Sequence, residues 1–116
     1  MRYELNDKTY DIELYRTEYK DGCTAVIAVI DINAPEPFAV FTVHTCPNCV
    51  HSIPPKDEII LDTKNYPNIL EFLCKNNIVN TMGCFVIHDN YEYPVAKLNF
   101  EEIEEYPESL KLYLEL

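Results

Sequence analysis

Apolar and polar side chains alternate near the start of the chain. Between residues 8 and 18, Tyr10 and Ile12 are separated by Asp11 and followed by Glu13. This period of two is typical of a strand with one buried face, and it predicts a strand over the whole stretch. A shorter strand is predicted over residues 1–5, before the turn dipeptide Asn6-Asp7.

Residues 24–30 are apolar on both faces, as expected for a strand in the middle of a sheet. The Asp21-Gly22 dipeptide before them supplies the positive φ angles of a tight hairpin. Residues 38–44 form the next apolar run. We therefore predict that residues 1–44 form an antiparallel meander, with Val26 to Ile30 in its interior.

The middle of the chain predicts a loop, a short strand and a helix. Residues 45–57 contain three prolines and two cysteines and predict the loop, and residues 58–61 predict the strand. Thr63 or Asn65 is expected to cap the helix, and Asn76-Asn77 to end it. The apolar stripe that predicts this helix consists of Ile69, Leu70, Phe72 and Leu73.

The last third predicts two more strands, over residues 84–87 and 95–100. From Glu101 the pattern is helical in period, with Pro107 opening a last helix from Leu110 to Leu114. Strands this close in sequence leave no room for parallel crossovers. The sequence thus predicts a single α+β domain over residues 1–116: a mostly antiparallel sheet with an N-terminal β-meander, one central helix and one C-terminal helix.

Charge and composition exclude several classes of function. The chain has 9 Lys and Arg against 20 Asp and Glu, which gives a net charge of −11. We expect it to bind neither nucleic acid nor a membrane, because phosphates and anionic lipids attract clustered Lys and Arg. Two distant glycines, Gly22 and Gly83, exclude glycine-rich phosphate loops. The first residues lack the apolar core of a signal peptide, and five cysteines fit reduced thiols, so we expect a cytoplasmic protein.

Cys46 and Cys49 form a Cys-Pro-x-Cys motif, flanked by His44 and His51. The turn of such a knuckle can present two thiolates to zinc. A closed site needs four ligands, and packing all four into eight residues strains a tetrahedral geometry. A loop with free thiols is the favoured interpretation, zinc is the alternative, and a redox motif is third because the prolines that follow block the helix it needs.

Two further polar groups have structural explanations. His88-Asp89 could be an acid–base pair, but a strand end that runs into a turn explains it better, since adjacent strand residues point to opposite faces. Asp62-Thr63-Lys64-Asn65 could hold a cation, but helix capping explains it better. We expect no catalytic residues and no enzymatic activity.

Three stretches of the chain resemble a bacterial family of proteins, the domain of unknown function numbered four-three-one-three. They are Glu36-Pro37-Phe38-Ala39, then Leu61-Asp62-Thr63-Lys64-Asn65-Tyr66-Pro67, and finally Gly83 with Phe85 and Tyr93-Pro94 followed by Leu98 and Phe100. Members of this family are small proteins often carried on conjugative elements and phages. The resemblance implies that the protein is associated with a mobile genetic element, and it implies no activity.

The acidic residues Glu101, Glu102, Glu104 and Glu105 lie within five positions of each other. A solvated surface is one interpretation, and a surface that imitates DNA phosphates to occupy a basic protein is the other. We expect a non-enzymatic module that binds another protein, with these four residues in the contact and no cofactor. The alternative is a small zinc-binding domain organised by Cys46 and Cys49.

Overall fold

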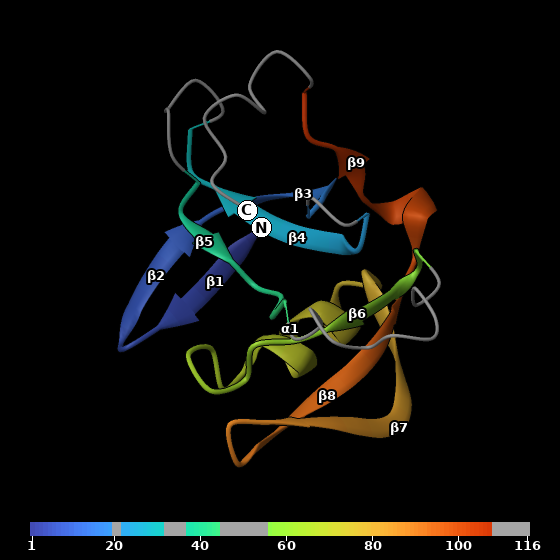
Figure 1. Cartoon of the computed structure of the whole chain (residues 1–116). Coiled ribbons are helices and arrows are strands. Elements are labelled where there is room, and N and C mark those ends of the chain that lie inside the picture. Colours follow the sequence, from blue (N-terminus) through green and yellow to red (C-terminus); the bar gives the residue numbers. More distant parts are fainter. Residues whose placement is uncertain (20–21, 32–36, 45–55, 108–116) are drawn as a thin grey trace.

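The structure is a computed structural model, and it describes residues 1–19, 22–31, 37–44 and 56–107. In these ranges the strands form three sheets, with the orders β1-β2, β5-β4-β3-β9 and β6-β8-β7 (Figure 1). Strand pairs are antiparallel except β3 with β9. The α+β class and the mostly antiparallel sheet are confirmed, while the expected helix over 110–114 lies outside the described residues.

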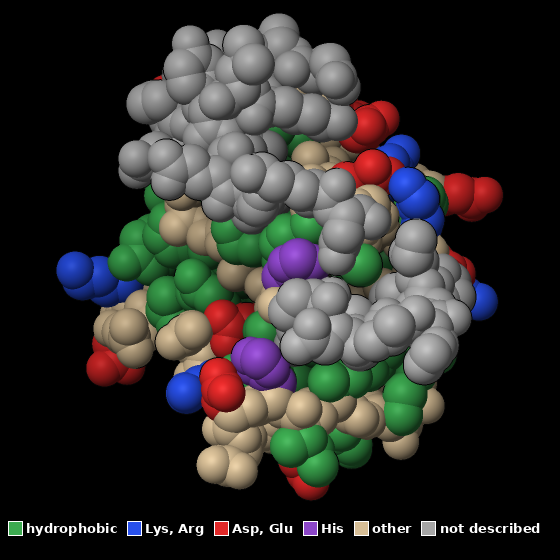
Figure 2. Space-filling view, in the orientation of Figure 1, with side chains coloured by type: hydrophobic (Ala, Val, Ile, Leu, Met, Phe, Trp, Pro, Cys, Tyr) green, Lys and Arg blue, Asp and Glu red, His purple; other side chains and the backbone are tan. Residues whose placement is uncertain are grey.

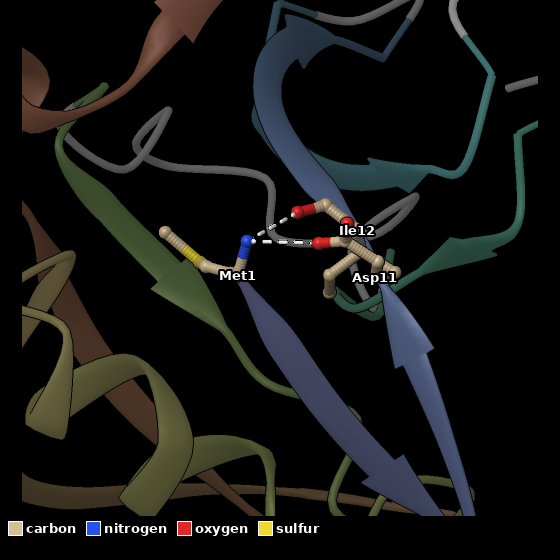
Figure 3. A network of polar contacts seen from close by, with 3 residues as sticks. All are labelled: Met1, Asp11 and Ile12. Atoms are coloured by element: carbon tan, nitrogen blue, oxygen red, sulfur yellow. Dashed lines mark hydrogen bonds and ion pairs between the residues drawn. The ribbon is translucent and has the colours of Figure 1, made fainter.

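The first two strands, β1 (Arg2–Leu5) and β2 (Lys8–Asp11), form a hairpin. Asn6 and Asp7 make its turn, with φ angles of 53° and 65°, a conformation that Asn and Asp tolerate better than most residues. At the open end, the amino group of Met1 donates to Oδ1 of Asp11 at 3.3 Å and to the carbonyl oxygen of Ile12 at 3.1 Å (Figure 3). These contacts hold the two strands together where the ladder stops.

The predicted long strand over residues 8–18 is divided at Ile12, which corrects the single meander. The N–H of Ile12 donates to the carbonyl oxygen of Met1 at 2.8 Å, so pairing with the first strand continues to this point. From there the chain enters another sheet as β3 (Glu13–Glu18), which pairs with β4 (Thr24–Val29). The chain thus stops pairing with the first strand at Ile12, which is buried, and then pairs with β4. Residues 1–44 therefore contribute to two sheets.

All six residues of β4 are buried, as the apolar run predicts. Ile30 was expected in the interior, but it lies past the end of the strand and is 57 % exposed. The next strand is also shorter than predicted, since β5 comprises only Ala39–Val40. Beyond it Thr42 bridges to Leu61, and this link joins the four-stranded sheet to the three-stranded one.

The three-stranded sheet consists of β6 (Glu58–Ile60), β8 (Tyr91–Leu98) and β7 (Val79–His88). The predicted strands of this region are present, and both strands of the β7–β8 hairpin are longer than expected. The strand predicted over residues 95–100 ends at Leu98, because Phe100 begins the next turn. β7 bends sharply (Figure 1) at a bulge between Thr81 and Phe85, where Gly83 has a φ of 71°. Such a bulge interrupts the ladder at an edge strand.

The central helix α1 spans Ile69–Lys75 and ends at Asn76, as predicted. Its N-cap is Asn68, which makes no capping hydrogen bond with its side chain, so the expected caps Thr63 and Asn65 are wrong. Oδ1 of Asp62 instead accepts from the backbone N–H of Asn65 at 3.2 Å, and Oδ2 accepts from its amide at 2.8 Å. The polar run thus shapes the turn before the helix.

The acidic segment after residue 100 is not the α-helix that its period suggests. Phe100–Glu102 form one 3₁₀ turn, η1, and Glu104–Glu105 form the strand β9. β9 lies parallel to β3, with Glu104 opposite Tyr15. Burial explains the difference, because Ile103 and Tyr106 on either side of β9 are both buried and anchor the segment against the body of the protein.

The main core lies where the three sheets and α1 meet. The hairpin contributes Tyr3, whose ring packs against Phe41 and Phe72 at centroid distances of 5.1 and 4.9 Å. The buried residues of this core are Tyr3, Ile12, Leu14, Val26, Ala28, Ala39, Phe41, Ile59, Leu61, Ile69, Leu73, Ile78, Val79, Ala96, Leu98 and Ile103.

Within the described residues, no helix has the length and apolar character needed to cross a bilayer.

Candidate functional site

A hollow of about 530 Å³ lies beside η1, and we call it the η1 groove. Three acidic residues, Asp57, Glu101 and Glu102, line it together with the aromatic residue Phe100. The remaining lining residues are Asn77, Leu98 and Asn99. The groove therefore combines negative charge with an aromatic surface.

Asn99 organises the groove. Its backbone N–H donates to the carbonyl oxygen of Ile78 at 2.8 Å, and its carbonyl oxygen accepts from the N–H of Glu102 at 2.9 Å. Its side-chain amide donates to the carbonyl oxygen of Asn77 at 2.7 Å and accepts from the amide of Asn80 at 3.1 Å. One residue thus connects the end of β8 to η1 and to the segment after α1.

Asp57 reaches the groove from the turn before β6. Its carbonyl oxygen accepts from the N–H of Leu98 at 2.6 Å, so the ladder between β6 and β8 determines its position. Its carboxylate lies 3.6 Å from Nζ of Lys97, and its side chain is 38 % exposed. At that exposure the ion pair is weak, and the carboxylate stays available to a competing cation.

Phe100 is also in contact with Arg16. The guanidinium carbon of Arg16 lies 4.7 Å from the centre of the Phe100 ring, a cation–π contact. Arg16 belongs to β3, and its carbonyl oxygen accepts from the N–H of Tyr106 at 2.8 Å. Phe100 therefore contacts the four-stranded sheet, while Asp57 and Asn99 adjoin the ends of β6 and β8 in the three-stranded one.

The structure separates the four predicted partner-binding glutamates into two pairs. Glu101 and Glu102 line the η1 groove, but Glu104 and Glu105 lie on β9. Glu105 borders a second, smaller hollow of about 30 Å³ that it shares with Arg16 and Phe100. The helical period expected from Glu101 does not hold these four residues together, because the segment changes from η1 to an extended strand after Glu102.

Glu104 affects the ionisation of a tyrosine on the neighbouring strand. The Tyr15 hydroxyl donates to the carboxylate of Glu13 at 2.8 Å, and this hydrogen bond is the largest cause that raises the pKa of Tyr15 to about 12. Burial and the negative charges of Glu13 and Glu104 add to the increase. The phenol stays neutral at ordinary pH and adds no charge to this acidic surface.

The other sequence candidates divide into described and undescribed residues. Cys46 and Cys49, the candidate zinc ligands, lie outside the described residues. Inside the described ranges, no group of three or more His, Cys, Asp or Glu side chains could hold a metal ion. His88 and Asp89 do touch, with Nε2 of His88 3.3 Å from Oδ2 of Asp89. We expected the two side chains to point in opposite directions, but Asp89 lies in the turn after the strand, at a φ of 51°.

Comparison with known protein families, with curated proteins and with solved structures found no match to the chain. Sequence reasoning singled out Glu101 and Glu102, but it missed Asp57, Asn77 and Asn99 in the same site. These three come from segments far apart in the chain. In the sequence they stand out only as polar residues near the ends of predicted strands and the predicted helix.

Proposed function

We propose that this protein is a non-enzymatic module that binds a basic segment of another protein in the η1 groove. One observation carries the proposal: Asp57, Glu101 and Glu102 line a single hollow together with Phe100. A Lys or Arg side chain is a good match for this combination. Its charged end can pair with the carboxylates, and its aliphatic or guanidinium part can lie on the aromatic ring.

The charge of the whole chain favours the same class of partner. A net charge of −11 attracts a basic protein before contact and raises its rate of association. A protein segment that contacts DNA or RNA phosphates is basic for the same physical reason. The proposed partner is therefore a nucleic-acid-binding protein, whose basic segment meets carboxylates in place of phosphates. The resemblance to small proteins of mobile elements is consistent with such an inhibitor of a host protein.

The test measures binding of a short synthetic peptide of alternating Lys and Gly to the purified chain by calorimetry. The double variant Glu101→Gln/Glu102→Gln removes two groove carboxylates. We expect its Kd to rise about tenfold, which corresponds to about 1.4 kcal/mol. Raising the salt from ~0.05 to ~0.3 M should weaken binding to the unmodified chain, because added ions screen the carboxylates.

The matched control is Glu4→Gln/Glu71→Gln, which makes the same change in net charge at two exposed carboxylates on β1 and α1 that do not line the groove. We expect this control to bind the peptide nearly as well as the unmodified chain. Equal weakening in both double variants contradicts the proposal, because the peptide then responds to net charge and not to the groove. No measurable binding by the unmodified chain contradicts it as well.

A further inference from the structure

Phe100 combines an exposed aromatic side chain with acidic neighbours. The structure describes all five phenylalanines of the chain, and two of them are exposed, Phe85 at 60 % and Phe100 at 38 %. Phe85 lies on β7, whose ten residues include no Asp or Glu. Phe100 instead lines the η1 groove together with Asp57, Glu101 and Glu102. Phe100 is thus the exposed phenylalanine that shares a hollow with three acidic residues.

Arg16 shows that the ring of Phe100 accepts a guanidinium group. The guanidinium carbon of Arg16 lies 4.7 Å from the centre of this ring. Nε of Arg16 is buried and has no hydrogen-bond partner in the described part of the chain, so the cation–π contact accompanies an unsatisfied donor. Arg16 borders the smaller hollow and is not among the residues that line the η1 groove. It therefore leaves the groove open to a second cation.

The charges in the η1 groove favour this second cation. Glu101 and Glu102 are exposed and form no ion pair with any other residue that the structure describes, whereas Asp57 lies near Lys97. Acidic and basic side chains lie next to one another on the side of the molecule that carries η1 and β9 (Figure 2). An incoming cation thus meets two carboxylates that no described cation neutralises.

We propose that the η1 groove selects arginine over lysine in its partner, and that Phe100 determines this selectivity. The inference rests on the proposed function, in which the groove binds a basic segment. A guanidinium group is flat, so its face can lie on a ring while the N–H groups at its edge donate to carboxylates. The ammonium group of lysine is compact and strongly hydrated, and it loses more hydration when it approaches an aromatic ring.

The proposal narrows the class of partner. Among basic segments that contact nucleic acid, the groove should favour those rich in arginine over those rich in lysine. A cation–π contact at an exposed site changes Kd by about two- to fivefold, and the paired N–H groups of a guanidinium strengthen its contact with a carboxylate. We therefore expect an arginine peptide to bind about fivefold more tightly than a lysine peptide of the same length.

Calorimetry with two synthetic peptides tests the proposal, one of alternating Arg and Gly and one of alternating Lys and Gly. Phe100→Leu should reduce the fivefold difference in Kd to about twofold or less, because it removes the ring and keeps the carboxylates. Phe100→Tyr keeps an aromatic ring and should keep the difference. The matched control is Phe85→Leu, which removes an exposed ring away from the groove and should also keep it.

The outcomes separate this inference from the proposed function. Equal Kd values for the two peptides with the unmodified chain, or a difference that Phe100→Leu leaves unchanged, overturn the selectivity and leave the binding of basic segments intact. If neither peptide binds, the proposed function fails and this inference fails with it.

A second measurement uses the unmodified chain alone, so it does not depend on the folding of a variant. Proton NMR of N-acetyl-arginine amide follows the CH₂ group next to the guanidinium as the chain is added. We expect these protons to shift upfield, because the ring current of Phe100 shields groups that lie over its face. The corresponding protons of N-acetyl-lysine amide should shift less. Equal shifts for the two amides overturn the proposal.

Discussion

The hydroxyl of Tyr3 donates a hydrogen bond to Oδ1 of Asn68 at 2.7 Å, across 65 residues of sequence. The amide of the same Asn68 donates to the carbonyl oxygen of Glu4 at 2.8 Å. Asn68 therefore binds β1 at two points while it occupies the N-cap of α1. This use of its side chain explains why it makes no capping hydrogen bond to the helix itself.

The first prediction concerns this connection between the hairpin and the helix. Tyr3→Phe removes one hydrogen bond and should lower the free energy of unfolding by about 1 kcal/mol. Asn68→Ala should cost more, because it leaves both the Tyr3 hydroxyl and the Glu4 carbonyl without this partner. Urea unfolding of the two variants provides the measurement. If Asn68→Ala is no less stable than Tyr3→Phe, the two contacts do not contribute as described.

The second prediction concerns alkaline pH. Burial is the main cause that raises the pKa of Tyr3 to about 12, and the nearby Tyr66 phenol adds to it. The unfolded chain loses this proton near pH 10, so above that pH the unfolded state is favoured progressively. The stabilisation from Tyr3 is complete below pH 10 and is lost as the pH rises from about 10 to about 12.

Thermal unfolding followed between pH 8 and 12 by circular dichroism measures this effect. Tyr3→Phe carries no ionisable group at this position, so its stability should decrease less steeply over the same range. Tyr15→Phe removes a second phenol whose pKa is raised to about 12, here chiefly by its hydrogen bond with Glu13, so its stability should also decrease less steeply. Identical slopes for Tyr3→Phe and the unmodified chain would contradict the prediction.

The third prediction compares two neighbouring positions at the end of β4. Val29 is 2 % exposed and Ile30 is 57 % exposed. Val29→Asp buries an unpaired carboxylate and should destabilise the fold by about 3 kcal/mol or more. Ile30→Asp places the same group in water and should change stability by only about 0.5 kcal/mol. Similar melting temperatures for the two variants would show that the boundary between buried and exposed residues does not lie between Val29 and Ile30.

The fourth prediction concerns Cys46 and Cys49. Two thiolates on one knuckle supply half of a structural zinc site, so we expect the purified chain to contain far less than one zinc per molecule. Elemental analysis after purification without chelator provides the measurement. Stoichiometric zinc that Cys46→Ser abolishes would contradict this prediction and favour the zinc-binding alternative.

Local sequence patterns were sufficient to predict the strands and the helix in which buried residues follow a regular pattern. The continuous apolar run of β4 predicts burial on both faces, and the stripe from Ile69 to Leu73 predicts α1. β9 could not be found in this way, because Glu104-Glu105 has poor strand propensity and pairs with residues far away in the chain. The exposure of Ile30 was missed for a related reason, since it depends on where the neighbouring strand ends.

The candidate site was predictable only in part. The density of acidic residues points to Glu101 and Glu102, but it does not separate them from Glu104 and Glu105. That separation depends on Ile103 and Tyr106 being buried, and therefore on the tertiary structure. Asp57 reaches the groove through the pairing of β6 with β8, which no local pattern encodes.

The parallel pairing of β9 with β3 also has a consequence for how the chain folds during its synthesis. Tyr15 and Glu104, which lie opposite each other, are 89 positions apart, so a ribosome must release almost the whole described chain before this edge can form. Until then the buried side chains of Ile27 and Val29 lack the contact with Tyr106 that completes their cluster. The nascent four-stranded sheet therefore stays incomplete until late in translation, and loop closure over this distance slows its last step.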